Sequence, residues 1–468
     1  MQLKRKRRGR ISRALGLITA NLLAAAGAHA QVADDQGANA TIDGGGVNDD
    51  TRTDLGLTRV DSAVLFYQEA GGRVKTTEPV VNVAFNGSGG DVVSIKLTAD
   101  ILTGATPNGA APWTGSQTFV TPAHPPGSTA TVTNSSGGST LVTIPGTGVV
   151  ARQYVIGPNQ LPVDAGFRDE RYAVDVGYST LWDADTRLSG GLSASTERDY
   201  SSYSANIGGS RDLNHKNTTL SLAFDFEYDL SRPYFGTPTP FTVMSADAKG
   251  PNQSKLVYSL VAGVTQVINR YWLAQLNYSV GSTDGYQTDP YRIISVVDPS
   301  SGAPLSYLYE NRPRTRLRQS VYFGNKIALG PTFLDVSGRY YRDSWGINSF
   351  TGAISDRIPV LRGVYFEPEG RYYTQTAANF FQNYLISGQS LPAYASSDSR
   401  LGKFDAVTLG GKVGVKVNHM GELYVQAEYY RQMGAAHPAG VISGLAGENL
   451  FTGITATSVL VGYTFAFY

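Results

Sequence analysis

The sequence predicts an all-β fold, namely a transmembrane antiparallel β-barrel of about 16 strands with short periplasmic turns and long extracellular loops. Three observations carry this prediction. Apolar and polar residues alternate with a period of two, the alternating segments are long, and the connections between them alternate between short and long. Because successive residues of a strand point to opposite faces, such alternation gives each strand one apolar face and one small or polar face.

The composition excludes several other classes of protein. The 468 residues include no cysteine, so disulfide frameworks, thiolate metal sites and cysteine nucleophiles are excluded. The 53 glycines and 28 tyrosines favour strands and turns over helices. No internal apolar run reaches the roughly 20 residues that a membrane helix needs, which excludes a helical membrane protein.

The first thirty residues have the form of a secretory signal peptide. A basic opening precedes an apolar stretch over residues 14–28, and Ala28-His29-Ala30 is the small-x-small pattern that a signal peptidase cleaves. An uncleaved anchor helix is the alternative, but the stretch is short and ends in a cleavage signal. We therefore expect export and removal of residues 1–30.

The charge balance is acidic once these residues are removed. The signal segment holds 7 of the 39 Lys and Arg residues and none of the 38 Asp and Glu residues, which leaves 32 against 38, or a net charge of −6. That balance argues against nucleic acid as a partner. Residues 31–58, rich in Gly, Asp, Asn and Thr, predict a flexible periplasmic tail, and residues 59–468 the barrel.

The last segment illustrates the alternation. Val459, Val461, Tyr463, Phe465 and Phe467 share one face, whereas small or polar residues occupy most of the other. Many of the segments exceed ten residues, which suits a tilted bilayer crossing of about 9–11 residues. A soluble sandwich would alternate in the same way with its apolar face inward. The sixteen predicted strands are 60–69, 73–85, 90–102, 171–183, 186–199, 201–213, 217–230, 253–268, 271–284, 313–328, 332–346, 353–367, 370–382, 402–417, 421–433 and 456–468.

The connections favour the barrel over the sandwich. Connections after even-numbered strands are all short, and every long connection follows an odd-numbered strand, as expected for periplasmic turns and extracellular loops. The long connections are 103–170, 231–252, 285–312, 383–401 and 434–455. Aromatic residues near strand ends suit the membrane interfaces. They are Trp182, Tyr228, Trp272, Tyr429, Phe465 and Phe467.

Two resemblances add to this interpretation. The chain end, with Gly462, Phe465 and Phe467, resembles the targeting signal of outer-membrane barrels, which implies the barrel-assembly machinery as a partner. Segments 61–69, 74–83 and 97–109 resemble the opening of a family of uncharacterised Gram-negative outer-membrane β-barrel proteins, catalogued as a domain of unknown function. This resemblance implies location and architecture but no established activity. Some members of the family are suspected of serving extracytoplasmic flavin or redox pathways.

The charged residues on the polar faces are the candidate functional residues, because a barrel of 16–18 strands encloses an aqueous channel. Arg314, Arg316 and Arg318 predict a basic ladder with steps of about 7 Å, and Asp225, Glu227 and Asp229 an acidic ladder. A wet pore with walls of opposite sign is one interpretation, and a lumen closed by salt bridges is the other. The predicted lumen-lining charges are Lys96, Asp100, Asp175, Glu197, Asp225, Glu227, Asp229, Arg314, Arg316, Arg318, Asp335, Arg339, Lys412, Lys416 and Glu428.

Catalysis has little support in the sequence. Neither a Ser-His-Asp arrangement nor a metal-binding spacing surrounds His124, His215, His419 or His437, so we expect no enzyme, no metal and no cofactor. The long connection 103–170 has three interpretations: a constriction folded into the lumen, a binding site for an outside partner, or a surface loop.

The sequence thus favours a porin-like channel for small hydrophilic solutes in the outer membrane of a Gram-negative bacterium, with membrane lipid and the assembly machinery as partners. The alternative is a structural barrel without a pore that holds an exported redox or surface complex. A barrel enzyme ranks third. The oligomeric state does not follow from the sequence.

Overall fold

The computed structural model describes residues 56–467 except 88, 123–139, 144–149, 235, 246–248 and 418–420. The predicted signal peptide and almost all of the predicted tail lie outside these residues. The first strand begins at Gly56, so the barrel takes in the last three residues assigned to the tail from sequence.

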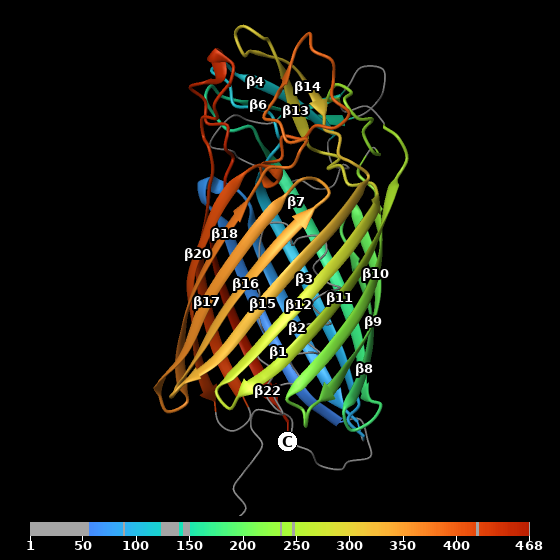
Figure 1. Cartoon of the computed structure of the whole chain (residues 1–468). Coiled ribbons are helices and arrows are strands. Elements are labelled where there is room, and N and C mark those ends of the chain that lie inside the picture. Colours follow the sequence, from blue (N-terminus) through green and yellow to red (C-terminus); the bar gives the residue numbers. More distant parts are fainter. Residues whose placement is uncertain are drawn as a thin grey trace, which may run out of the picture.

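Sixteen antiparallel strands form one closed barrel, which confirms the predicted fold class and strand number (Figure 1). Pairing of the first strand with the last, from Arg59 opposite Ala466 to Glu69 opposite Ala456, closes the sheet. The barrel strands are β1 (Gly56–Glu69), β2 (Lys75–Asn86), β3 (Val92–Pro107), β7 (Val163–Leu181), β8 (Thr186–Thr196), β9 (Tyr200–Leu213), β10 (Thr218–Ser231), β11 (Gln253–Asn269), β12 (Trp272–Gly285), β15 (Thr315–Leu329), β16 (Thr332–Asp343), β17 (Asn348–Leu361), β18 (Val364–Gln375), β20 (Phe404–Val417), β21 (Gly421–Met433) and β22 (Thr455–Ala466).

Loop length sorts between the two rims as predicted. One rim, where β1 begins and β22 ends, carries only short turns between the described strands. The other rim carries the five long connections, which span residues 108–162, 232–252, 286–314, 376–403 and 434–454. The described parts of the long connections rise above the barrel as a cap (Figure 1).

One hairpin is displaced from its predicted position. We expected strands at 353–367 and 370–382 joined by a turn at 367–369, but β17 and β18 meet at a turn over residues 362–363. Gly363 has φ 80° there, a conformation that glycine adopts without strain. Pro368, inside the expected turn, lies within β18 opposite Gly411, where the ladder to β17 is interrupted. A proline is tolerated in a strand where no N–H group is needed.

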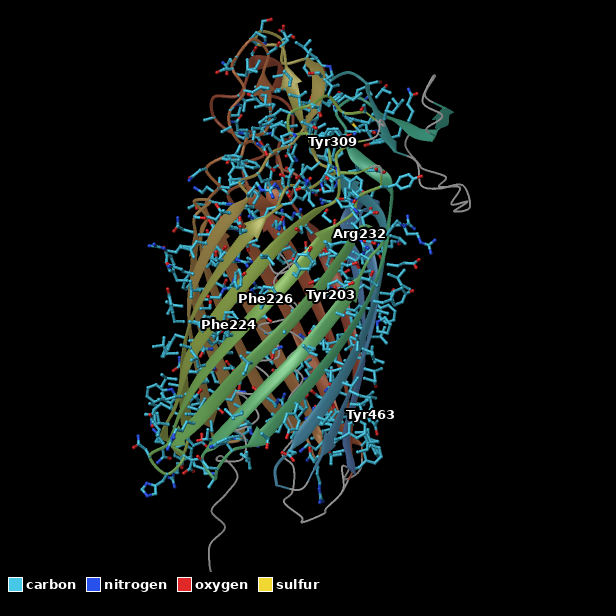
Figure 2. The ribbon with its side chains drawn as sticks, turned by 90° about the vertical axis from the view of Figure 1, so that its right-hand side faces the viewer. Tyr203, Phe224, Phe226, Arg232, Tyr309 and Tyr463 are labelled. Atoms are coloured by element: carbon cyan, nitrogen blue, oxygen red, sulfur yellow. The ribbon has the colours of Figure 1, made fainter. Side chains whose placement is uncertain are left out.

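The outer surface of the barrel is apolar. In β10 the outward residues include Leu222 and Phe224, whose side chains are exposed, while Ala223 between them is buried. Phe224 is labelled on its strand in Figure 2. Large exposed apolar side chains recur in the same way on every barrel strand from β7 to β12. An apolar outer face suits contact with lipid acyl chains, because a closed sheet leaves no unpaired backbone groups in hydrocarbon.

The cap contains two small sheets. One has the order β4–β6–β5, from β4 (Gln117–Pro122), β6 (Val150–Ile156) and β5 (Thr140–Thr143), all within the longest connection. The other has the order β14–β13–β19, from β14 (Pro304–Tyr309), β13 (Ile293–Val297) and β19 (Leu385–Ile386), so it joins two connections. Short 3₁₀ turns lie at η1 (Ala70–Gly72), η2 (Ser399–Leu401) and η3 (Ser443–Leu445). Among the described residues, no helix is long and apolar enough to cross a membrane.

The two rims predict opposite accessibility in intact cells. A short peptide tag near residue 240 or residue 300, both in the cap, should be labelled by an impermeant reagent added to whole cells. A tag near residue 184, in the turn between β7 and β8, should be labelled only after the outer membrane is opened. Equal labelling of both sets in intact cells would contradict this orientation of the barrel.

Candidate functional site

An acidic ladder lines one wall of the lumen. Asp225, Glu227 and Asp229 occupy three successive inward positions of β10, and their side chains are 3%, 3% and 1% exposed. Lys255 of β11 lies opposite Asp229, and its Nζ is 3.4 Å from Oδ2 of that carboxylate. Three carboxylates therefore face one lysine on the adjacent strand.

Further charges of both signs lie on β3 and β7 of the same barrel. Asp100 of β3 forms an ion pair with Arg171 of β7, a partner that the sequence analysis did not single out. Lys96 and Asp175 lie opposite each other in the register of the same two strands. Glu197, which we placed in a predicted strand ending at residue 199, instead follows β8 in the short connection at the cap rim. In this part of the wall Asp100 therefore has an ionic partner on the adjacent strand.

The predicted basic ladder has two rungs within the strand instead of three. Arg316 and Arg318 occupy inward positions of β15, but Arg314 precedes that strand and is exposed. Pro313 and Arg314 continue the long connection, and the ladder to β12 begins only at Thr315. Both counted arginines have partners: Arg316 reaches Asp343 at 2.6 Å, and Arg318 donates to the Thr283 hydroxyl at 3.2 Å. The Arg316 guanidinium also lies 4.2 Å from the Trp345 ring centroid.

The lumen is hollow beside β15 and β16. Lys326 and Asp335 pair at 3.5 Å, although their side chains remain 51% and 40% exposed. Arg339, four residues after Asp335 on the same face of β16, is also exposed. The exposure of these inward side chains shows that water reaches the charges of β15 and β16. Arg371, on β18, faces the same side of the lumen.

Aromatic and polar side chains surround the charges of β20 and β21. The Nζ of Lys412 is 4.3 Å from the ring centroid of Tyr424, which places the ammonium over an aromatic face. Gln426 donates to Glu428 at 2.7 Å and to Glu369 at 2.8 Å, so one amide links two carboxylates. Lys416 is exposed close to the short-turn rim.

The cap has a hydrophobic core of its own. Phe119 and Tyr154, from the longest connection, stack with ring centroids 5.3 Å apart. They pack with Ile293 and Tyr309 of the connection between β12 and β15. A second cluster joins Leu308 to Leu385 across two connections. Because these connections come from different hairpins, burial of their apolar side chains holds the cap together as one folded unit.

The cap also contains a buried ion cluster. Asp398 accepts contacts from three arginines: Arg400 at 2.6 Å, Arg312 at 2.9 Å and Arg292 at 3.4 Å. Glu310, completely buried, pairs with Arg312 at 2.6 Å. Arg292, Glu310 and Arg312 belong to the connection between β12 and β15, whereas Asp398 and Arg400 belong to the connection between β18 and β20. The cluster therefore ties two hairpins together.

The two carboxylates of the cluster respond to burial in opposite ways. Burial opposes ionisation of Asp398, yet Arg292, Arg400 and Arg312 outweigh it and hold the pKa of Asp398 well below its usual value. Burial raises the pKa of Glu310, and Arg312 only partly offsets this. A carboxyl group whose pKa is lowered by folding stabilises the folded state at any pH above its unfolded pKa of about 4. That stabilisation is lost as the pH falls through the lowered pKa of the folded state. Mild acid therefore leaves the Asp398 contacts intact.

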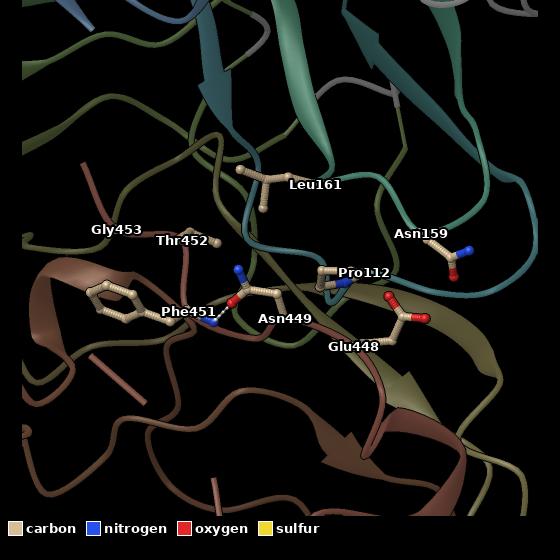
Figure 3. A pocket seen from close by; sticks show the side chains of 8 residues that line it. All are labelled: Pro112, Asn159, Leu161, Glu448, Asn449, Phe451, Thr452 and Gly453. Atoms are coloured by element: carbon tan, nitrogen blue, oxygen red, sulfur yellow. Dashed lines mark hydrogen bonds between the residues drawn. The ribbon is translucent and has the colours of Figure 1, made fainter. Parts of the chain in front are cut away.

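A small pocket opens between two outer connections (Figure 3). Its volume is about 270 Å³, and Pro112 and Leu161 line one side while Asn449 and Phe451 line the other. Ligand pockets usually enclose about 300–1,000 Å³. The backbone N–H of Phe451 donates to Asn449 Oδ1 at 3.0 Å, so part of the polar lining is already paired. Its small volume and the hydrogen bond within its lining make this pocket a poor candidate for a ligand-binding site.

The two described histidines lie in connections and not on the lumen wall. His215 lies in a short turn and His437 in the last long connection, whereas His124 and His419 lie outside the described residues. Among the residues that the structure describes, no three acidic or histidine side chains gather to hold a metal.

At the chain end, Gly462 of β22 leaves room for the Tyr424 ring inside the barrel, because a Cβ atom on Gly462 would lie 2.2 Å from Tyr424 Cζ. Phe465 points outward, and its ring meets that of Phe467 at 4.5 Å.

A closed antiparallel barrel with an apolar outer face and a charged interior defines the class of outer-membrane β-barrel proteins. Within that class, the chain belongs to the family described as protein of unknown function DUF3570, whose model matches residues 47–465. This confirms the family resemblance found in the opening segments. No curated protein matches the chain in sequence.

Several solved structures resemble the chain at low sequence identity. OccK2 (OpdF) of Pseudomonas aeruginosa, in complex with glucuronate, is 10% identical with a TM-score of 0.37, over 90% of this chain and 100% of that one. The siderophore receptor PirA of the same organism is 11% identical with a TM-score of 0.36, over 88% of this chain and 63% of that one. The chain thus spans less than two thirds of the length of that receptor.

Proposed function

We propose that this protein is a porin-like channel that passes small hydrophilic solutes across the outer membrane of a Gram-negative bacterium. The observation that carries the proposal is the charged interior, in which Lys326, Asp335 and Arg339 are inward yet exposed. Water around fixed charges of both signs is the condition for passage of polar solutes. The proposal includes export by a cleaved signal peptide over residues 1–30, assembly by the barrel-assembly machinery, and no catalytic step.

Ion selectivity in a planar bilayer tests the channel. We expect ohmic conductance, and we expect Arg318→Ser with Arg339→Ser to raise the cation-to-anion permeability ratio, because two inward cations are removed. A unit charge about 10 Å from an ion in water contributes about 0.4 kcal/mol, with opposite signs for a cation and an anion, so each substitution should change the ratio up to about fourfold. Arg316 is a poorer probe, because its loss would leave Asp343 buried without its main partner.

The matched control is Lys216→Ser. Lys216 lies in a short turn outside the lumen, with its side chain 46% exposed. This variant should keep the original selectivity. An unchanged ratio in the double variant would contradict a conduction path past β15 and β16.

The second candidate function is a structural barrel that holds an exported redox or surface complex. The folded cap supports it, because a cap with its own apolar core and buried ion cluster offers a stable outer surface. Absence of conductance together with stoichiometric co-purification of a periplasmic or surface protein would favour this function over the channel.

A further inference from the structure

The acidic ladder of β10 is unevenly supplied with partners. Asp229, at its cap end, has the Lys255 ammonium 3.4 Å away. Both carboxylate oxygens of Asp225 and Oε1 of Glu227 are buried, and within the described part of the chain they accept no hydrogen bond. Asp225 and Glu227 thus lack the ion pair with Lys255 that Asp229 forms. A buried carboxylate oxygen without a donor destabilises the folded protein.

A neighbouring hydroxyl is unpaired in the same place. Ser204 of β9 lies opposite Glu227 in the register, and its Oγ is buried with no hydrogen-bond partner among the described residues. The side chain of Ser204 points to the inside of the barrel, as those of Asp225 and Glu227 do. A carboxylate pair and a hydroxyl acceptor thus converge on one stretch of the lumen wall. Their common requirement is a ligand that donates several hydrogen bonds and carries positive charge.

Lys255 shows which chemistry fits this wall. Its ammonium group contacts the Asp229 carboxylate and lies 5.6 Å from the ring centroid of Tyr200. An ammonium has three donors, and Asp225, Glu227 and Ser204 each supply at least one acceptor oxygen without a partner among the described residues. The same contacts are therefore available to an ammonium group that arrives on a solute.

A metal ion fits less well. Among the residues that the structure describes, no group of three carboxylate or histidine side chains is placed to enclose one. The serine-rich surroundings add hydroxyl groups instead, since Ser202 and Ser259 face inward beside Asp229 and Asp225. Val257, buried opposite Glu227, gives the wall an apolar side against which an alkyl chain packs.

We propose that Asp225, Glu227 and Ser204 form a binding site for the protonated primary amine of a solute in the lumen. The proposal rests on the channel function proposed above and gives it a substrate class, that of small organic cations with N–H donors. The solute amine takes the position on the lower rungs that Lys255 takes on the upper one.

Calorimetric titration of the purified full-length protein with 1,4-diaminobutane tests the site. The same titration with the bis(trimethylammonium) form of that diamine compares a dication of equal charge without N–H donors, and magnesium chloride compares a metal dication. We expect the diamine to bind at least about tenfold more tightly than either, because a hydrogen bond to a charged group is worth about 1.5–3 kcal/mol. Asp225→Asn with Glu227→Gln should weaken diamine binding at least about tenfold.

Asp335→Asn is the matched control variant. It removes a carboxylate from the lumen that already pairs with Lys326, so diamine affinity should stay within about twofold. Equal binding of the two organic dications, tighter binding of magnesium, or equal loss in the control would each overturn the amine site. Conductance of the same preparation separates the two proposals: conductance without diamine binding refutes this site alone, and diamine binding without conductance refutes the channel alone.

Discussion

Replacement of Asp398 by Asn is expected to loosen the cap without unfolding the barrel. The substitution keeps the size of the side chain but leaves Arg292, Arg312 and Arg400 around a neutral group. Removal of one partner from a buried ion pair costs about 3–5 kcal/mol. Amide hydrogens of the connections at 286–314 and 376–403 should therefore exchange about 10²- to 10⁴-fold faster than in the original protein.

The control for this change is Asp298→Asn. Asp298 lies in the turn between β13 and β14, is partly exposed, and accepts hydrogen bonds from nearby groups of its own turn, including Ser300 and Ser301. Exchange in the cap should be unaffected by it. If exchange in Asp398→Asn matched the original protein, the ion cluster would not be what joins the two hairpins, and the apolar core would have to do so alone.

Replacement of Leu192 by Arg is expected to impair assembly of the barrel. Leu192 is 66% exposed at the middle of β8 and points to lipid. A lipid-facing arginine at the bilayer midplane costs about 2–4 kcal/mol. The fraction that refolds into lipid vesicles, read from heat-modifiable electrophoretic mobility, should fall, and the urea midpoint should drop with it.

The adjacent residue supplies the control. Ser193 points into the lumen opposite Asp175, so Ser193→Arg places the same side chain in water beside a carboxylate. This variant should fold almost as well as the original protein. Equal loss in both variants would contradict the assignment of the apolar face to lipid, because a one-residue step along a strand changes only the face.

Most of the barrel follows from the sequence because its two physical requirements act locally. An apolar residue at every second position, as in Val459 to Phe467, satisfies lipid on one face whatever the rest of the chain does. Because consecutive barrel strands run in opposite directions, connections after even-numbered strands lie at one rim and connections after odd-numbered strands lie at the other. The hairpin of β17 and β18 was misplaced because Pro368 is accommodated within β18 by an interruption of the ladder to β17, and that interruption depends on the neighbouring strands.

The lumen charges were predictable in direction but not in pairing. Alternation assigns Arg316 and Asp225 to the inside, yet it does not say that Arg316 meets Asp343 on the next strand while Asp225 meets no donor in the described structure. Lys255 and Arg171 were missed although their strands were predicted. Their roles come from the register, which places each beside one carboxylate.

The sequence by itself determined a closed barrel with an apolar outside, a charged inside and long loops at one rim, because side-chain periodicity and turn residues are properties of neighbours in the chain. Only the tertiary structure decided the cap. Asp398 and Arg312 lie 86 positions apart, and their contact depends on two hairpins folding against each other above the membrane. No periodic pattern marks such residues, because irregular connections are positioned by their packing and not by a repeating backbone geometry.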